Sequence, residues 1–233
     1  MSDSGKQIVV AVTGASGAIY TLRLVQTLLC AGCQLHVVIS NAAKQVFQEE
    51  LGVTPPQHDQ GASGWLSMFQ QIQQQSDVAW NFREAGTVDA GQLGSLRQYG
   101  LADFRASAAS GSARIAGMVV CPCSMGTLSS IACGASSNLI HRAADVQLKE
   151  RRPLILVPRE TPLGLIQLEN MVRLSQAGAT ILPAMPGFYH GPQGMGDLVD
   201  FIVARICDHL NVPHQLSRRW GQSTPDASGP DAT

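Results

Sequence analysis

Short, β-branched apolar runs alternate with helix-like segments along most of this 233-residue chain. A run of four or five such residues bounded by turn residues is typical of a strand that is buried on both faces. The alternation predicts an α/β fold of three layers, a parallel sheet with helices on both faces. The expected strands are 8–12, 35–39, 118–121, 154–157 and 180–182, and the expected helices are 20–29, 41–50, 124–134, 138–151, 165–177 and 195–210.

Two regions fall outside this alternation. Residues 54–113 are rich in Gln, Ser, Gly and Ala, and they predict only a helix near 65–75 and a loop at 106–113. The end of the chain is composed of Pro, Ser, Gly and Asp, which predicts disorder. The expected organisation is therefore a single domain over residues 1–220 and a disordered tail over 221–233.

The turn after the first expected strand reads VTGASGA, residues 12–18. A strand, a glycine-bearing turn and a helix in succession form a setting in which backbone N–H groups bind phosphate. The full dinucleotide fingerprint is absent, and Ser40 stands where a dinucleotide fold carries an acid for the ribose. A tight packing turn is the alternative for the loop alone. The loop and Ser40 together favour a mononucleotide.

Composition limits the classes of function. The net charge is −1 and no basic run is present, which argues against a nucleic-acid partner. No apolar run approaches membrane-spanning length and the first residues lack signal-peptide features, so a cytoplasmic location is expected. Charged residues make up 14% of the chain, against roughly 25% in ordinary domains. This shortage favours a homo-oligomer, and a Ser- and Gln-rich monomer surface is the alternative.

Six cysteines raise the question of a redox or metal site, since Cys30 and Cys33 form a C-x-x-C. They fall at the end of the first expected helix, where the helix dipole raises rather than lowers a thiol pKa. A zinc site would need two more ligands, and Cys121-Pro-Cys123 has an unusual spacing for them. Reduced, structural cysteines and no metal site are expected.

Polar residues follow each of the five expected strands. Ligands of parallel sheets bind beyond the carboxyl ends of the strands, so these residues should converge on one crevice. The segments concerned are Thr13–Gly17, Ser40, Pro122–Thr127, Pro158–Pro162 and Pro183–His190.

Three stretches carry a resemblance to a known family: SNLIHRAADVQLKERRPLILVPRETPLGLIQLENM, PAMPGFYHGPQGMGDLVDFIVAR and RRWG. On the basis of these stretches, residues 6–221 closely resemble the UbiX-type flavin prenyltransferases, which were formerly labelled aromatic-acid decarboxylases. The resemblance implies a Rossmann-like or flavodoxin-like fold and the synthesis of prenylated FMN in a cytosolic dodecamer. In that reaction the dimethylallyl group of dimethylallyl phosphate is joined to N5 and C6 of reduced FMN without a metal. A UbiD-type decarboxylase would receive the product.

The resemblance also implies roles for individual residues. Glu50 matches a catalytic carboxylate near the flavin, and Glu160 lies close to the prenyl phosphate. Trp220 matches an aromatic residue that encloses the prenyl site. The implied FMN contacts are Ala15, Ser16, Gly17, Ser40, Ser124, Met125, Gly126, Thr127 and Arg159, and the implied donor contacts are Arg142, Lys149, Tyr189 and Arg205.

Physical chemistry fits these roles, although simpler interpretations exist. Arg142 and Lys149 are two helical turns apart and share a face, which in most proteins is merely solvated. A phosphate dianion without a metal needs several fixed cations and donors, and these residues would supply them. Arg159 and Glu160 could be a surface ion pair, or could be directed into the crevice by the flanking prolines. A carboxylate there suits general acid/base work.

Two rival functions remain open at this stage. A flavin-dependent cysteine decarboxylase-like enzyme would carry a P-x-M-N-x-x-M-W signature, but here Met185 is followed by Pro186. A non-catalytic FMN carrier subunit would not need Glu50, Lys149 and Arg205. Neither the choice between a phosphate and a pyrophosphate donor nor the pathway served is determined by the sequence.

Overall fold

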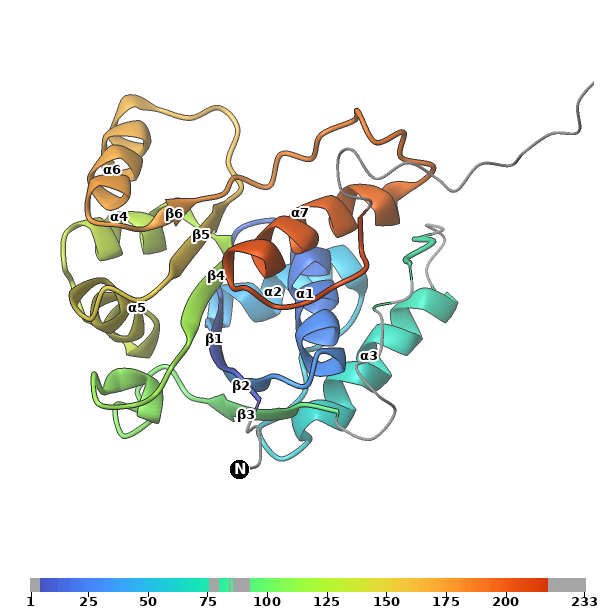
Figure 1. The fold of residues 1–233 in the computed structure, drawn as a ribbon, viewed down its shortest axis with the longest axis horizontal. Helices are drawn as coiled ribbons and strands as arrows, with labels where there is room; N and C mark the ends of the chain where they lie inside the picture. Colours follow the sequence, from blue (N-terminus) through green and yellow to red (C-terminus); the bar gives the residue numbers. More distant parts are fainter. Residues whose placement is uncertain (1–4, 76–79, 84, 86–92, 218–233) are drawn as a thin grey trace, which may run out of the picture.

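The computed structural model describes residues 5–75, 80–83, 85 and 93–217, and in it a parallel sheet lies between two layers of helices (Figure 1). The six strands are arranged in the order β3-β2-β1-β4-β5-β6. The strands are β1 (Gln7–Val12), β2 (Gln34–Ile39), β3 (Ser95–Tyr99), β4 (Gly117–Cys123), β5 (Leu154–Pro158) and β6 (Thr180–Ile181). The helices are α1 (Ala18–Cys30), α2 (Asn41–Leu51), α3 (Gly61–Gln75), η1 (Ser107–Ala109), α4 (Met125–Ala132), α5 (Leu139–Lys149), α6 (Leu165–Gln176) and α7 (Met195–His209).

The expected three-layer α/β fold is confirmed, and so are the five strands and seven helices that the pattern predicted. The edge strand β3 was not predicted. Its sequence, SLRQY, has no apolar run, because an edge strand with exposed positions along its length needs few apolar side chains. The loop expected at 106–113 contains the short helix η1. The disorder expected at 221–233 and the implied role of Trp220 lie outside the described residues.

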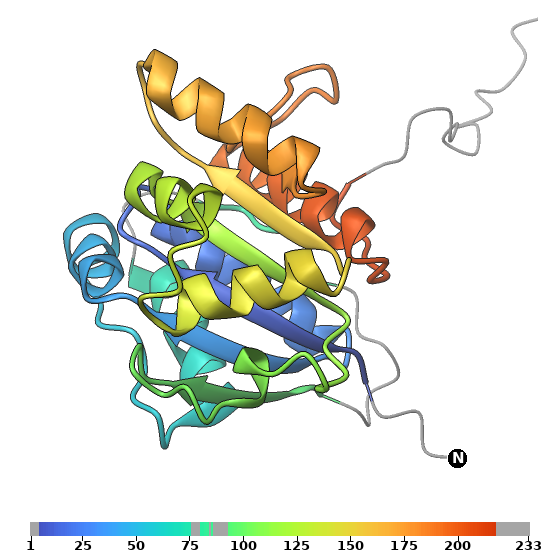
Figure 2. The same ribbon diagram turned by 90° about the vertical axis from the view of Figure 1, so that its left-hand side faces the viewer.

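Alternate residues of β1 supply the two apolar layers. Ile8, Val10 and Val12 face the layer of α1, α2, α3 and α7, whereas Val9 and Ala11 face α4 and α5. Figure 2 shows these layers from the side of α4, α5 and α6. Because β1 is buried on both faces, nearly all of its residues are apolar, which explains the continuous apolar run in the sequence.

The chain changes direction across the sheet between β1 and β4. Helix α1 leaves β1 on one face and α4 leaves β4 on the other, so the loops that follow these two strands diverge. Such a switch point opens a crevice beyond the carboxyl ends of the strands, which is where doubly wound sheets bind ligands. The first loop, Thr13–Gly17, therefore lies where folds of this kind bind their ligands.

A buried ion pair fixes α7 against α1. The Nε atom of Arg23 lies 2.6 Å from Oδ1 of Asp200, and both side chains are buried. The Arg23 guanidinium also stacks over the Phe82 ring, 4.8 Å from its centroid. Removing one partner of such a pair would leave an uncompensated buried charge, which is strongly destabilising. The pair therefore sets the position of α7 and of the residues that it carries.

The cysteines lie mostly in the core. Burial raises the pKa of the Cys33 thiol to about 11 and that of Cys123 to about 12. Cys30 ends α1, as expected, and burial also raises its pKa. Among the described residues no group of three or more His, Cys, Asp or Glu side chains could hold a metal ion. Within the same residues no helix combines the length and apolar character needed to cross a membrane.

Candidate active site

The first loop ends at a helix start that binds an anionic group. Gly17 precedes α1 with a φ of 120°, a conformation that L side chains rarely adopt, which explains the glycine. The N–H groups of Gly17 and Ala18 donate to the carboxylate of Glu50 over 2.8–3.0 Å. Unpaired N–H groups and the helix dipole favour negative charge at such a start. The structure therefore brings Glu50, the predicted catalytic carboxylate, to the predicted flavin loop.

Two serines cap the helices on either side of this loop. The Oγ atom of Ser40 accepts from Ala43 N at 3.1 Å and begins α2. Ser124 begins α4 in the same manner, accepting from Thr127 N at 3.4 Å. The two hydroxyls mark two further helix starts at the same edge of the sheet as the first loop. Met125, Gly126 and Thr127 form the first turn of α4.

Thr13 ties the loops of β1 and β4 together. Its Oγ1 atom donates to Pro122 O at 2.8 Å and accepts from Ser124 N at 2.8 Å. Ser40 N in turn donates to Val12 O at 2.9 Å, so the end of β2 joins the same arrangement. These bonds hold the loops after three neighbouring strands in one geometry, which preorganises a binding surface.

Arg159 and Glu160 follow β5 at this edge. The Nε atom of Arg159 is buried and has no hydrogen-bond partner among the described residues. Glu160 accepts from the next backbone N–H, that of Thr161, at 3.1 Å. The described residues show no ion pair between Arg159 and Glu160, so the surface-pair interpretation fails. A buried guanidinium donor without a partner is what a phosphate or a flavin oxygen would satisfy.

Tyr189 and Arg205 lie on one side of α7. The Tyr189 ring meets the Phe201 ring edge to face at 5.8 Å, and Arg205 follows Phe201 by one helical turn. Tyr189 is 69% exposed, and Arg205 is also exposed. Arg205 pairs with Asp208 at 3.1 Å. Two members of the predicted donor site therefore lie on neighbouring parts of one surface.

Arg142 and Lys149 share α5, as predicted, but make separate contacts. Arg142 donates from Nε to Ala109 O at 3.2 Å and pairs with Asp145 at 3.1 Å. Lys149 pairs with Glu150 at 3.0 Å, and the hydrogen bond from this ammonium lowers the pKa of the Glu150 carboxyl. Both cations are partly exposed, at 37% for Arg142 and 48% for Lys149.

Within one chain, Lys149 lies at the opposite edge of the sheet from the flavin loops. It ends α5 just before β5 begins, and its Nζ atom lies near Gly111, on the approach to β4. The amino and carboxyl edges of a sheet with strands of this length are about 20 Å apart. A single chain therefore does not bring Lys149 to Glu50 or Arg159.

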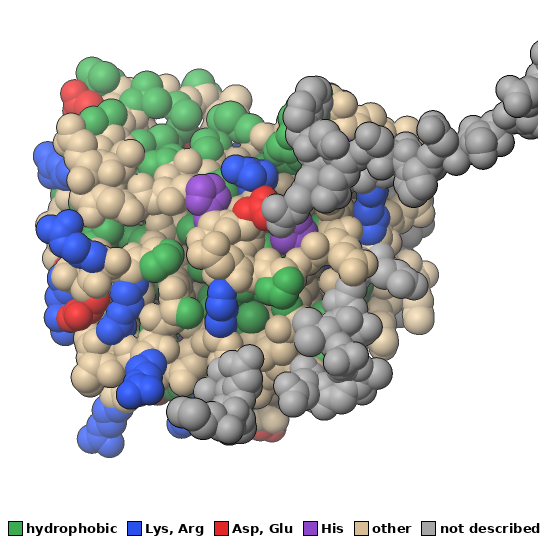
Figure 3. All heavy atoms as spheres, in the orientation of Figure 1, with side chains coloured by type: hydrophobic (Ala, Val, Ile, Leu, Met, Phe, Trp, Pro, Cys, Tyr) green, Lys and Arg blue, Asp and Glu red, His purple; other side chains and the backbone are tan. Residues whose placement is uncertain are grey.

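Helix α6 exposes an apolar surface. Leu165, Ile166 and Val172 are 71%, 69% and 57% exposed, and the one buried residue of the helix is Leu174. In Figure 3 apolar side chains gather over this part of the molecule. An exposed patch of this kind on a protein with few charges marks an interaction surface. We call Leu165, Ile166, Leu168 and Val172 the α6 surface.

The sequence did not reveal the carboxylates that hold the arginines. Asp145 and Asp208 each follow their arginine by three positions, a spacing that allows contact on a helix and could have been noticed. The buried Nε atom of Arg159 carries no sequence signal, because burial depends on the packing of the whole edge.

Comparison with known proteins finds relatives over nearly the whole chain. The Flavoprotein family model matches residues 1–207. The flavin prenyltransferase UbiX of Pseudomonas aeruginosa is 47% identical over 217 residues, which cover 93% of this chain and 95% of the relative.

Solved structures give the same result. AnUbiX, in complex with FMN and dimethylallyl pyrophosphate, matches with a TM-score of 0.76 and 34% identity, covering 94% of this chain and 100% of that one. A dodecameric FMN-dependent UbiX-like decarboxylase from Escherichia coli O157:H7 matches with a TM-score of 0.72 and 36% identity, over 93% of this chain and 100% of that one.

Proposed function

Because this chain belongs to the UbiX flavin prenyltransferase family, we propose that it transfers the dimethylallyl group of dimethylallyl phosphate to reduced FMN at the carboxyl edge of its sheet. One observation carries the assignment of the site. The ends of β1, β2, β4 and β5 bring the anion-binding start of α1, two capping serines and the buried Nε atom of Arg159 to one edge.

The flavin fits this edge. Its phosphate and polar ring edge would contact the first loop (Ala15, Ser16 and Gly17), Ser40, the first turn of α4 and Arg159. The Glu50 carboxylate accepts hydrogen bonds from Gly17 and Ala18, which supports the fit because it shows that these N–H groups bind an anionic group. Reduced FMN would supply two nucleophilic atoms, N5 and C6, for the two new carbon bonds.

The chain's carboxylates would move protons. The C–O bond of the donor breaks as the carbon–nitrogen bond forms, the electron pair leaves with the phosphate, and Glu160 would hold a proton at the departing phosphate oxygen. The second carbon bond forms when the remaining alkene takes up a proton at its central carbon and its tertiary carbon bonds to flavin C6. Glu50 would accept the proton that leaves flavin C6. Both are general acid/base tasks that suit carboxylates at the rim of a dry pocket.

Two copies of the chain would build the donor site. Tyr189 and Arg205 lie together on one surface, whereas Lys149 lies at the far edge of the same chain. We infer that Lys149, with Arg142 on the same helix, reaches the site of a neighbouring copy. The exposed α6 surface supports such an assembly, and so does the dodecamer formed by the Escherichia coli relative. Without a metal, the phosphate dianion needs these converging cations.

The proposal includes a dodecameric assembly, a cytoplasmic location and delivery of prenylated FMN to a UbiD-type decarboxylase. Static light scattering tests the assembly. A stable monomer at micromolar concentration would contradict it.

A turnover assay tests the function. The purified protein is incubated anaerobically with reduced FMN and either dimethylallyl phosphate or dimethylallyl pyrophosphate, and flavin products are separated and weighed by mass spectrometry. We expect a flavin that carries one added dimethylallyl group, formed with at least one donor. Calorimetry should also show tighter binding of FMN than of NAD. No prenylated flavin with either donor, or a preference for NAD, would contradict the proposal.

A further inference from the structure

Three side chains form a chain of contacts at the end of α7. The Oδ2 atom of Asp208 lies 3.1 Å from Nη1 of Arg205, and its Oδ1 atom lies 3.1 Å from Nε2 of His214. Exposure falls along the series, from 51% for Arg205 through 32% for Asp208 to 2% for His214. A surface arginine is thereby connected through one carboxylate to a buried imidazole.

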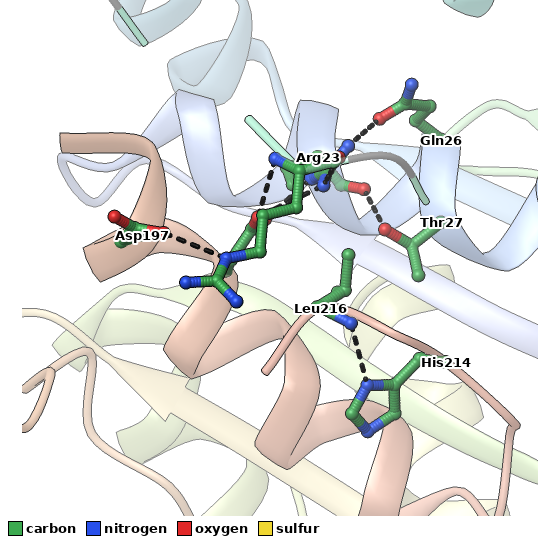
Figure 4. Close-up of polar contacts among 8 residues, drawn as sticks. Arg23, Gln26, Thr27, Asp197, His214 and Leu216 are labelled. Atoms are coloured by element: carbon green, nitrogen blue, oxygen red, sulfur yellow. Dashed lines mark hydrogen bonds and ion pairs between the residues drawn. The ribbon is translucent and has the colours of Figure 1, made fainter. Parts of the chain in front are cut away.

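A backbone N–H group determines which ring nitrogen of His214 carries the hydrogen. The N–H group of Leu216 donates to Nδ1 of His214 at 3.3 Å, as Figure 4 shows. Because Nδ1 accepts this bond, the ring hydrogen lies on Nε2 and donates to Asp208. The segment that carries His214 is itself attached to α7, since Val212 N donates to Cys207 O at 2.9 Å. His214 is therefore a fixed donor aimed at Asp208.

Asp208 contacts Arg205 and His214 through different oxygens. One of its oxygens is oriented by His214, so the other faces Arg205, one turn earlier on the same helix. Within the described residues, the Arg205 guanidinium forms no hydrogen bond other than the one from Nη1. Phe201, four positions before Arg205 on the same helix, contacts the Tyr189 ring, so Arg205 shares its side of α7 with that contact. A long arginine side chain held in one orientation loses less freedom when it binds a ligand.

We infer that Asp208 and His214 are positioning residues that hold Arg205 in the orientation in which it binds the phosphate of the prenyl donor. The inference rests on the proposed function, which assigns Arg205 to that phosphate. It extends the donor site by two residues that do not themselves touch the donor.

Steady-state kinetics on four variants tests the inference. Asp208→Asn and His214→Leu should each raise the KM for dimethylallyl phosphate about threefold to tenfold. Saturating donor should restore a normal kcat, and the Kd for FMN should not change, because the flavin contacts come from other strand ends. His214→Gln should restore the KM to within about twofold of wild type, since its amide N–H can also donate to Asp208. His209→Gln, an exposed neighbour on the same helix, is the matched control and should behave as wild type.

A double-mutant cycle separates positioning from a structural role. If Asp208 acts through Arg205, adding Asp208→Asn to Arg205→Ala should change the KM by less than about twofold. A general effect on folding would appear in both backgrounds, and would lower the melting temperature and the affinity for FMN. An unchanged KM in Asp208→Asn, or a full effect in the absence of Arg205, would overturn the inference. An inactive wild-type protein would instead contradict the proposed function.

Discussion

The predicted flavin half and the predicted donor half of the proposed active site are built differently. The predicted flavin residues lie on loops after neighbouring strands of one sheet, and hydrogen bonds of Thr13, Ser40 and Ser124 join these loops. The predicted donor residues lie on helices and a long loop and are exposed or partly exposed, and the three cations among them pair with carboxylates one or three positions away. The proposed flavin site therefore lies within a single chain, at the carboxyl ends of its strands. The proposed donor site uses surface cations, and their arrangement would depend on the assembly.

The largest expected effect is on the rate of the chemical step. Glu160→Gln should keep both halves intact and lower the rate of prenylation about 100-fold or more, because the departing phosphate loses its proton donor. Single-turnover kinetics at saturating FMN and donor measures this. Glu49→Gln, an exposed carboxylate next to Glu50, serves as the control. Near-normal rates in Glu160→Gln would remove Glu160 from the mechanism.

Loss of a cation from the predicted donor half should weaken binding of the prenyl donor and leave FMN binding unchanged. Arg205→Ala removes a charged hydrogen bond, which is worth roughly 1.5–3 kcal/mol, so the KM for the donor should rise at least about tenfold. FMN affinity, measured by calorimetry, should stay the same. The exposed Arg114→Ala variant controls for loss of charge. If Arg205→Ala weakened FMN binding as much as donor binding, the two halves would not be separate.

The smallest effect concerns the flavin half. Ser40→Ala removes the cap of α2 and one predicted flavin contact. Loss of the cap should lower the free energy of unfolding by about 1 kcal/mol. FMN should bind several-fold more weakly while the KM for the donor is unchanged. Denaturant unfolding and calorimetry measure the two quantities. Ser67→Ala, on the exposed side of α3, is the comparison. A change in donor KM equal to that in FMN affinity would contradict the division.

The sequence predicted the positions of the proposed flavin residues on the fold better than those of the proposed donor residues, for a physical reason. Parallel strands fix where their carboxyl ends go, so residues such as Ser40 and Ser124 can be placed from the alternation of strands and helices alone. Lys149 was correctly placed on a helix, but its distance from Arg159 follows from the direction in which that helix runs. Strand β3 was missed because an exposed edge lacks the apolar run that identifies β1 and β4.

The central claim is that the donor site combines Lys149 of one chain with Tyr189 and Arg205 of another, and subunit mixing tests it most directly. Lys149→Ala and Arg205→Ala chains are each purified, then unfolded and refolded together in equal amounts, with each variant refolded alone as the control. A shared site predicts that the mixture regains about one quarter of wild-type activity, because random assembly of a symmetric oligomer makes that share of sites intact. A mixture no more active than its separate components would contradict the claim and would locate the whole donor site within one chain.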